Sequence, residues 1–271
     1  MNKKYGLLGH PLGHSFSKKF HNERFSRLGI DAEYVNYDLE DIFKLPDILL
    51  NEPTLCGLNV TIPYKQQVIR FLDEMDPVAQ RIGAVNTICL HRIPNDKSRE
   101  RVSKIQGLWL KGFNTDIIGF RDSIMPLLRQ AGILDEEGRA NDNAAALILG
   151  TGGASKAIKV ALEDMGISFT FVSRSSSPGR LTYEHLSPDV MARHRVIINC
   201  TPIGTFPNVN ECPNIPYECL TSSHVCYDLV YNPEVTLFLA KAKEKGAFTM
   251  SGGAMLEGQA IASYNYWTEK D

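Results

Sequence analysis

The sequence has almost no net charge, no long apolar run and no paired-cysteine motif, and each absence narrows the class of protein. Its 29 Lys and Arg residues nearly balance 31 Asp and Glu residues, so the formal net charge of −2 gives no electrostatic reason to bind nucleic acid or an anionic membrane. No apolar run approaches the roughly 20 residues that a membrane helix needs. The stretch after Lys3 and Lys4 is broken by His10, Pro11 and Gly13, unlike a signal peptide, so we expect a cytoplasmic protein.

The six cysteines form no Cys-x-x-Cys pair, which is the usual signature of a structural zinc site. His10 and His14 are four residues apart, but Pro11 and Gly13 disfavour a helix that would bring them together on one metal. We therefore expect reduced thiols and no bound metal.

Strand-like and helix-like segments alternate along the 271 residues, a length that suits one large domain or two smaller ones. Apolar runs typical of buried strands occur at 5–9, 32–37, 55–58, 144–149, 168–172, 196–200 and 225–230. Two more strands are predicted at 86–90 and 103–110, joined by an exposed turn at 91–101. The alternation predicts an α/β fold with mainly parallel sheets.

The apolar run at 144–149 leads into a glycine-rich turn, Gly150-Thr151-Gly152-Gly153-Ala154-Ser155, which opens a helix followed by another strand. This order is the dinucleotide-binding pattern, in which Gly150 permits a tight turn and Gly152 lets a pyrophosphate approach the backbone. Ser155 stands in place of the third glycine of the usual motif. The alternative is a purely structural tight turn.

The end of the strand at 168–172 indicates which dinucleotide binds. NAD sites usually carry an acidic residue there, whereas this chain has Ser173, Arg174 and Ser175. An arginine fork and serine hydroxyls can hold the extra phosphate of NADP, so the sequence favours NADP. The alternative is a polar turn with an incidental arginine.

The segment from Asn59 to Lys65 follows a short apolar strand, and Pro63 is a residue typical of a helix start. We therefore predict a helix from 64 to 72 with Lys65 in its first turn. The positive end of a helix dipole favours an uncharged amine, which suits proton transfer. The alternative is a solvated surface lysine.

Three further polar residues are candidates, although each has a structural explanation. Asp116 can cap the helix that follows it, or it can form an ion pair with Lys65. Ser15 and Ser17 can cap a helix at 17–28, or they can hold a carboxylate with two hydroxyls.

The motifs together resemble those of the shikimate dehydrogenase family over nearly the whole chain. The matching runs begin at Gly9, Asn59, Gly83, Asn114, Gly150, Asn199, Tyr227 and Gly252. Each run is common, but their joint order is specific to this family.

The resemblance implies two α/β domains with the active site in the cleft between them. The substrate domain would span 1–113 and be completed by 253–271, and a Rossmann-like NADP domain would span 114–252. The implied reaction is the reversible NADPH-dependent reduction of 3-dehydroshikimate to shikimate, in chorismate and aromatic amino-acid biosynthesis. The implied protein is a monomer or homodimer with only small-molecule partners.

The resemblance also assigns residues to roles. Lys65 would transfer the proton, and Asp116 would orient the lysine side chain. The substrate would be bound by Ser15, Ser17, Thr61, Asn86, Tyr231 and Gln259. The cofactor would be bound by Gly150, Thr151, Gly152, Gly153, Ala154, Ser173, Arg174, Ser175, Thr201 and Gly252.

Two other functions stay open. A quinate/shikimate dehydrogenase that uses NAD is disfavoured by serine at position 17, because relatives that act on quinate tend to carry threonine there, and by Arg174. A non-catalytic shikimate sensor of the same fold would be favoured by the loss of Lys65 or Asp116, and both are present.

Overall fold

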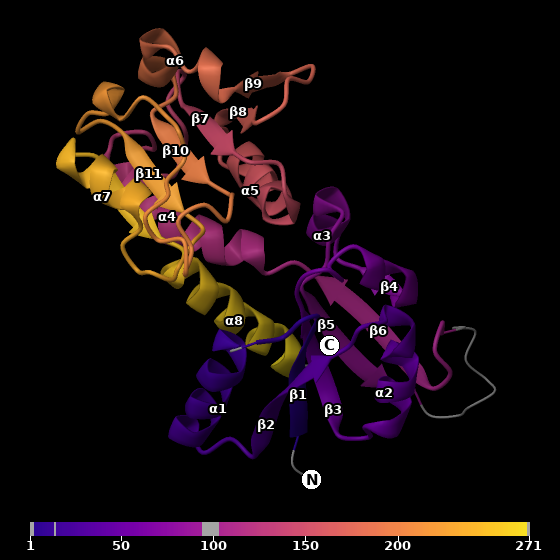
Figure 1. Ribbon diagram of the computed structural model, residues 1–271. Helices are drawn as coiled ribbons and strands as arrows, with labels where there is room; N and C mark the ends of the chain where they lie inside the picture. Colours follow the sequence, from indigo (N-terminus) through magenta and orange to yellow (C-terminus); the bar gives the residue numbers. More distant parts are fainter. Residues whose placement is uncertain (1–2, 14, 94–102, 270–271) are drawn as a thin grey trace. The chain divides into compact units, whose positions relative to one another are not determined.

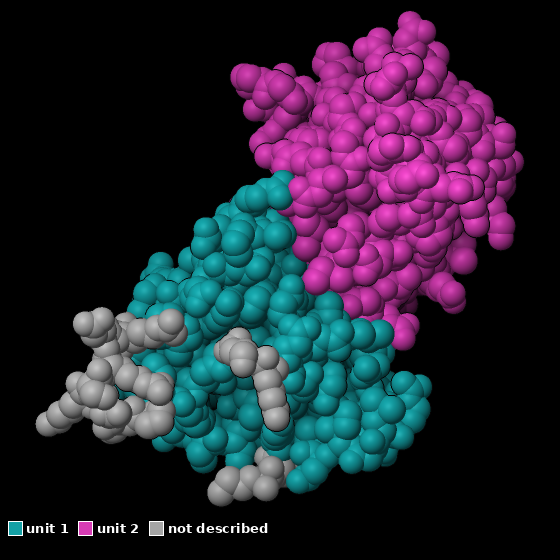
Figure 2. Space-filling view, turned by 180° about the vertical axis from the view of Figure 1, so that it is seen from behind, with its two compact units in different colours: residues 1–115, 260–271 teal, residues 116–259 magenta. Residues whose placement is uncertain are grey.

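The computed structural model describes residues 3–13, 15–93 and 103–269. The chain forms two compact units, shown in Figure 2. Unit 1 comprises residues 1–115 and 260–271, and unit 2 comprises residues 116–259. Within the described residues each unit has its own six-stranded sheet, so the predicted α/β class is confirmed.

The sheet of unit 1 has the strand order β2-β1-β3-β5-β6-β4. Its strands are β1 (Lys3–Gly9), β2 (Ala32–Asp38), β3 (Leu55–Val60), β4 (Glu74–Met75), β5 (Thr87–Arg92) and β6 (Leu108–Phe113). β1 is parallel to β2 and β3, and β4 is parallel to β6. β5 is antiparallel to both β3 and β6, so this sheet is mixed but mainly parallel, as predicted.

The local patterns placed most elements of unit 1 correctly, and two differences concern the strands β5 and β6. The predicted strand at 103–110 starts later, at Leu108, because a tight turn brings Leu108 N–H to the carbonyl of Ile105. β5 runs to Arg92, two residues into the predicted turn at 91–101, and residues 94–102 lie outside the described residues.

The helical segments of unit 1 are α1 (Phe16–Leu28), η1 (Ile42–Lys44), α2 (Leu45–Asn51), η2 (Gln67–Phe71) and α3 (Pro77–Ile82). Gly29 ends α1 in the left-handed conformation, which glycine adopts without strain. The C-terminal helix α8 (Gly253–Thr268) also reaches this unit. Its Trp267 lies where a Cβ on Gly57 would be only 2.3 Å from the indole, and it donates a 3.0 Å hydrogen bond to the Ile88 carbonyl.

A neutral histidine is buried in the aromatic core of unit 1. His21 is fully buried, and its ring stacks on Tyr34 with centroids 4.5 Å apart. Neither ring nitrogen has a hydrogen-bond partner within the described residues. Burial, together with the nearby positive charge of Arg24, lowers the pKa of His21 from 6.5 to about 3.

This histidine should make the protein sensitive to acid. Because its pKa is depressed in the folded state, its contribution to stability is complete above pH 6.5 and is lost as the pH falls toward 3. Wild type should therefore lose about 2 kcal/mol more stability between pH 7 and pH 5 than His21→Phe, which keeps an aromatic ring. Urea unfolding at both pH values measures this, with exposed His91→Gln as the control. Parallel curves for wild type and His21→Phe would contradict it.

The sheet of unit 2 is entirely parallel, with the order β12-β11-β10-β7-β8-β9. Its strands are β7 (Ala145–Leu149), β8 (Ser168–Ser173), β9 (Arg180–Thr182), β10 (Val196–Asn199), β11 (Val225–Asp228) and β12 (Phe248–Ser251). The chain moves outward from β7 to β9 and then returns to place β10 on the other side of β7. This reversal is the topological switch point where dinucleotides bind in Rossmann-like folds.

Helices cover both faces of this sheet (Figure 1). They are α4 (Asp116–Gln130), α5 (Gly153–Asp164), α6 (Pro188–Arg193) and α7 (Leu237–Glu244), with short turns η3 (Tyr183–His185) and η4 (Tyr217–Cys219). On one face Phe120 of α4 packs edge-on against Tyr227 of β11, with centroids 5.1 Å apart. On the other face α6 and α7 pack Met191 and Phe238 against the strands. The helix α4 contains Pro126 and continues to Gln130.

Candidate active site

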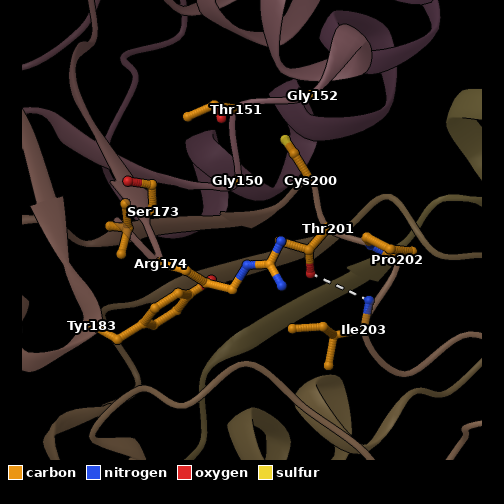
Figure 3. Close-up of a pocket in the computed structure, with 11 residues that line it drawn as sticks. Gly150, Thr151, Gly152, Ser173, Arg174, Tyr183, Cys200, Thr201, Pro202 and Ile203 are labelled. Atoms are coloured by element: carbon orange, nitrogen blue, oxygen red, sulfur yellow. Dashed lines mark hydrogen bonds between the residues drawn. The ribbon is translucent and has the colours of Figure 1, made fainter. Parts of the chain in front are cut away.

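The switch point of unit 2 holds a pocket of about 320 Å³ (Figure 3). In register, Leu149 lies beside both Val172 and Asn199, so the carboxyl ends of β7, β8 and β10 meet at this edge of the sheet. The lining residues follow these strand ends: Gly150, Thr151, Gly152, Val172, Ser173, Arg174, Tyr183, Cys200, Thr201, Pro202 and Ile203. The pocket therefore brings together six of the predicted cofactor residues.

The glycine turn has the geometry that a phosphate group needs. Gly150 has φ of +95°, which disfavours any other residue, and a Cβ there would lie 2.8 Å from Thr201 Cγ2. A Cβ on Gly152 would meet nothing within 4 Å, so the space beside this lining residue is open. Gly152 is also the N-cap of the 12-residue helix α5 and supplies no side-chain cap. The first N–H groups of α5 are thus suited to an anion.

The wall formed by the end of β8 is basic. Figure 3 shows the Arg174 guanidinium in the pocket together with Tyr183 and Thr201. No Asp or Glu is among the pocket-lining residues in the described part of the chain. Ser173 donates its hydroxyl to the Ser175 carbonyl at 2.5 Å, which fixes the turn around Arg174. An arginine without a competing carboxylate is the arrangement that accepts a ribose phosphate.

Tyr183 is a pocket residue that the sequence analysis missed. It follows β9, and the pairing of β9 with β8 cannot be recognised from local sequence patterns. Burial raises the pKa of its phenol, and the charge of Arg174 partly opposes that rise. No motif marks this residue, so only the pairing of β9 reveals it. Val172, Cys200, Pro202 and Ile203 were also absent from the predicted site.

The Thr201 wall is held by a buried polar chain. Thr201 donates from its backbone N–H and its hydroxyl to Asn199 Oδ1, at 3.0 and 2.6 Å. Asn199 Nδ2 donates to Asp228 Oδ1 at 2.9 Å, and Thr236 donates to Asp228 Oδ2 at 2.6 Å. Burial raises the pKa of Asp228 to about 6, against the effect of these hydrogen bonds. The carboxyl thus organises the loops after β10 and β11.

Four predicted cofactor residues do not line this pocket. They are Gly153, Ala154, Ser175 and Gly252. Gly252 has a local reason to be glycine, because a Cβ there would lie 2.2 Å from the Leu229 carbonyl oxygen. Gly153 and Ala154 form the first turn of α5 directly after the pocket residues.

The predicted helix at 64–72 is wrong. The residues after β3 form turns, and only the short 3-10 helix η2 follows, at Gln67–Phe71. Lys65 therefore precedes η2 and has no α-helix dipole to act on its amine. Its backbone is instead held by tertiary contacts: the Lys65 carbonyl accepts from Val85 N–H at 2.8 Å, and Tyr64 Oη donates to the Leu39 carbonyl at 2.5 Å. The Lys65 side chain is half-buried.

The two serines differ in their surroundings. Ser15 caps α1 by accepting from Lys18 N–H at 3.2 Å, and it also lines a shallow pocket with Lys18, Lys19 and Asn22. Ser17 is buried and hydrogen-bonds the phenol of Tyr34. The capping explanation therefore holds for Ser15, while Tyr34 contacts the Ser17 side chain.

The other predicted substrate residues lie at strand or helix ends. In unit 1, Thr61 follows β3 and Asn86 precedes β5; Asn86 is buried. In unit 2, Asp116 is the first residue of α4 and is also buried. Gln259, on α8, donates to the Leu256 carbonyl at 2.9 Å, and Tyr231 is 47% exposed. The ion pair between Asp116 and Lys65 stays a prediction.

Comparison with known proteins decides the family. Residues 7–88 match the family model for the shikimate dehydrogenase substrate binding domain. The chain is 33% identical to the "Shikimate dehydrogenase (NADP(+))" of Desulforamulus reducens over 291 residues, covering 97% of this chain and 89% of that protein. The chain belongs to the shikimate dehydrogenase family.

Solved structures of shikimate dehydrogenases have the same fold. A chorismate mutase/shikimate 5-dehydrogenase fusion protein from Clostridium acetobutylicum matches with a TM-score of 0.79 at 33% identity, covering 99% of this chain and 92% of that one. The Thermus thermophilus shikimate 5-dehydrogenase in complex with NADP(H) and shikimate matches with a TM-score of 0.76 at 29% identity, covering 98% and 93%. The segment matched to the family's substrate binding domain lies in unit 1, and the dinucleotide pocket lies in unit 2.

Among residues 3–13, 15–93 and 103–269, no group of three or more His, Cys, Asp or Glu side chains is arranged to hold a metal ion. Within the same residues, every helix is too short or too polar to span a bilayer.

Proposed function

We propose that the protein is an NADP-dependent shikimate dehydrogenase that interconverts shikimate and 3-dehydroshikimate in aromatic amino-acid biosynthesis. The observation that carries this proposal is the switch-point pocket, in which the glycine turn offers backbone N–H groups and Arg174 offers a cation without a nearby carboxylate. Membership of the family supports the substrate, since the curated relatives are named shikimate dehydrogenase (NADP(+)). Among the described residues, the pocket lining has no carboxylate of the kind that NAD sites use for the ribose.

The proton-transfer group is Lys65. When bound, the cofactor supplies the hydride acceptor or donor at its nicotinamide. In the oxidation, the alcohol O–H proton passes to the uncharged Lys65 amine as the C–H hydrogen leaves with its electron pair; in the reduction, the ammonium returns a proton to the new alkoxide oxygen. Asp116, one of the family's motif residues, orients this amine and accepts a hydrogen bond from a substrate hydroxyl.

The substrate residues divide by the group that they recognise. Ser15 and Ser17 hold the substrate carboxylate together with Tyr231, and Thr61, Asn86 and Gln259 bind ring hydroxyls. These assignments follow from matching positions in the family motifs. The buried position of Asn86 supports a fixed orientation for its amide.

The cofactor residues that support this proposal best are those lining the pocket. The glycine turn at 150–152 holds the pyrophosphate, and Arg174 with the neighbouring serines holds the 2′-phosphate. Gly153 and Ala154 complete the helix start, Thr201 lines the opposite wall, and Gly252 lies at the end of β12.

We further propose unit 1 as the substrate domain and unit 2 as the cofactor domain, within a monomer or homodimer. The six cysteines are all free thiols, which supports a reducing compartment such as the cytoplasm.

The test is a four-way assay. Purified protein is mixed with shikimate or quinate and with NADP or NAD, and absorbance is followed at the reduced-nicotinamide band. Rapid reduction with shikimate and NADP alone is expected. Comparable rates with quinate or NAD would replace the proposal with a broader quinate/shikimate dehydrogenase, and silence in all four mixtures with shikimate binding by calorimetry would replace it with a sensor.

A further inference from the structure

Unit 1 contains a buried cluster of side-chain hydroxyls and amides behind the predicted substrate residues. We name it the hydroxyl cluster, and it consists of Tyr34, Asn59, Thr87, Thr115 and Ser263. Asn59 is 4% exposed and the other four are fully buried. They come from β2, β3, β5, the residue before α4, and α8, so segments distant in sequence meet here.

Ser263 is the centre of the hydroxyl cluster. Its Oγ accepts from Asn59 Nδ2 at 2.8 Å. It also lies 2.8 Å from Thr87 Oγ1 and 3.0 Å from Thr115 Oγ1. Asn59 is oriented from its other end by Tyr34, whose hydroxyl donates to Asn59 Oδ1 at 2.8 Å. One serine on α8 therefore joins three separate segments of the unit.

At its edges the hydroxyl cluster contacts residues that we propose bind the substrate. Tyr34 hydrogen-bonds Ser17. Asn86 Oδ1 accepts from the Thr115 backbone N–H at 2.7 Å and lies within 3.1 Å of the Thr115 hydroxyl and 3.0 Å of the Thr87 hydroxyl. These contacts determine which end of the Asn86 amide is the oxygen. Thr115 is also covalently joined to Asp116.

A purely structural role explains this cluster poorly. Burying hydroxyl and amide groups costs free energy that hydrogen bonds at best offset, and apolar residues of similar shape are often equally stable or better. The neighbouring inward positions on α8, Ala260 and Ala262, are apolar, and the core strands contribute Leu58 and Ile88. A cluster that costs packing energy yet fixes Asn86 and the residue before Asp116 fits a role in positioning.

We propose that Ser263 and Thr115 are positioning residues for the substrate-side groups, acting on Asn86 and Asp116 without touching the substrate themselves. This inference rests on the proposed dehydrogenase function. Since small misplacements of reacting groups are costly, losing either hydroxyl should lower kcat/KM for shikimate about tenfold. NADP binding should not change, because the cofactor pocket belongs to unit 2.

The experiment compares Ser263→Ala, Thr115→Val and Thr115→Ser with wild type. Thr115→Val removes the hydroxyl at nearly constant volume, and Thr115→Ser restores it without the methyl. The matched control is Ser123→Ala, which removes a hydroxyl from α4 that lies 2.7 Å from Tyr227 Oη, outside the cluster. Steady-state kinetics with shikimate, NADP affinity by calorimetry and thermal unfolding are measured for each.

The expected result is a tenfold loss for Ser263→Ala and Thr115→Val, recovery in Thr115→Ser, and NADP affinity within about twofold of wild type. The double variant Ser263→Ala/Thr115→Val should lose less than the product of the single losses, because both hydroxyls belong to one network. Losses no greater than that of Ser123→Ala, or an equal loss of NADP affinity, would overturn the inference. An inactive wild type would instead overturn the proposed function.

Discussion

Lys65→Ala is expected to lower kcat for shikimate oxidation by about 10²- to 10⁴-fold, the range typical of a lost general base. NADP affinity should stay near the wild-type value, because Lys65 belongs to unit 1 and the dinucleotide pocket to unit 2. Initial rates at saturating shikimate and NADP, with cofactor binding by calorimetry, measure the two effects separately.

The backbone of Lys65 is held in place, so the proposed base, its side-chain amine, extends from a fixed position. Its carbonyl is held by Val85 N–H, and the preceding Tyr64 ring is 3% exposed and anchored to the Leu39 carbonyl. The chain at Lys65 is thus pinned on two sides although it is not helical. Removing the side chain beyond Cβ leaves these backbone contacts intact, so a loss of rate would report on chemistry rather than on folding.

Two further lysine substitutions sharpen the test. Lys65→Arg keeps the positive charge, but a guanidinium does not release its proton near neutral pH, so this variant should be nearly as inactive as the alanine variant. Lys4→Ala removes a half-buried lysine of the same unit that pairs with Glu52 at 2.9 Å, and its kcat should match wild type. Turnover by Lys65→Arg close to the wild-type rate would show that charge, and not proton transfer, is what Lys65 supplies.

In unit 2 the sequence predicts the elements that form the pocket but not the order of the strands in the sheet. In unit 2 the glycine turn, the helix α5 and the strand β8 are consecutive, and the sequence predicted them in that order. Their identity depends on local patterns: an apolar run, a residue that must adopt positive φ at Gly150, and helical spacing. The six-strand order was beyond such patterns, because it depends on contacts between segments far apart in the chain.

The wrong helix at Lys65 shows the same limit. Pro63 and the apolar residues after it satisfy the local signals of a helix start. The hydrogen bonds that fix Lys65 come from Val85, 20 residues later in the chain, and through Tyr64 from Leu39, 25 residues before that tyrosine. Tertiary contacts of this kind override a weak helical preference. The proposal that Lys65 is the proton-transfer group therefore depends on the family motif and not on a helix dipole.

Ser263 and Tyr183 were missed for related reasons. Ser263 is one small polar residue in a mostly apolar helix, and its significance is visible only once Asn59, Thr87 and Thr115 are seen around it. Tyr183 enters the pocket because β9 pairs with β8. Neither residue has a neighbour in sequence that marks it.

Arg174→Ala is expected to lower kcat/KM for NADP by about 10- to 100-fold while leaving the value for NAD within about twofold. The reason is that a charge-assisted hydrogen bond contributes about 1.5–3 kcal/mol, and each 1.4 kcal/mol is tenfold in affinity. Arg174 lines the pocket at the end of β8, and the lining residues include no carboxylate in the described part of the chain. The measurement is initial rate against cofactor concentration, with shikimate saturating.

The ratio between the two cofactors is the informative quantity, because it separates phosphate recognition from general damage to the pocket. Loss of the glycine turn or of Tyr183 would weaken NADP and NAD together, since both carry the pyrophosphate and adenine. Loss of Arg174 should affect only the dinucleotide with the extra phosphate, and Arg174→Lys should recover part of the effect because it keeps the charge without the planar fork. Arg193→Ala, an exposed arginine at the end of α6 outside the pocket, should change neither value. An equal loss for NADP and NAD in Arg174→Ala would mean that this arginine shapes the pocket and that NADP preference arises elsewhere in unit 2.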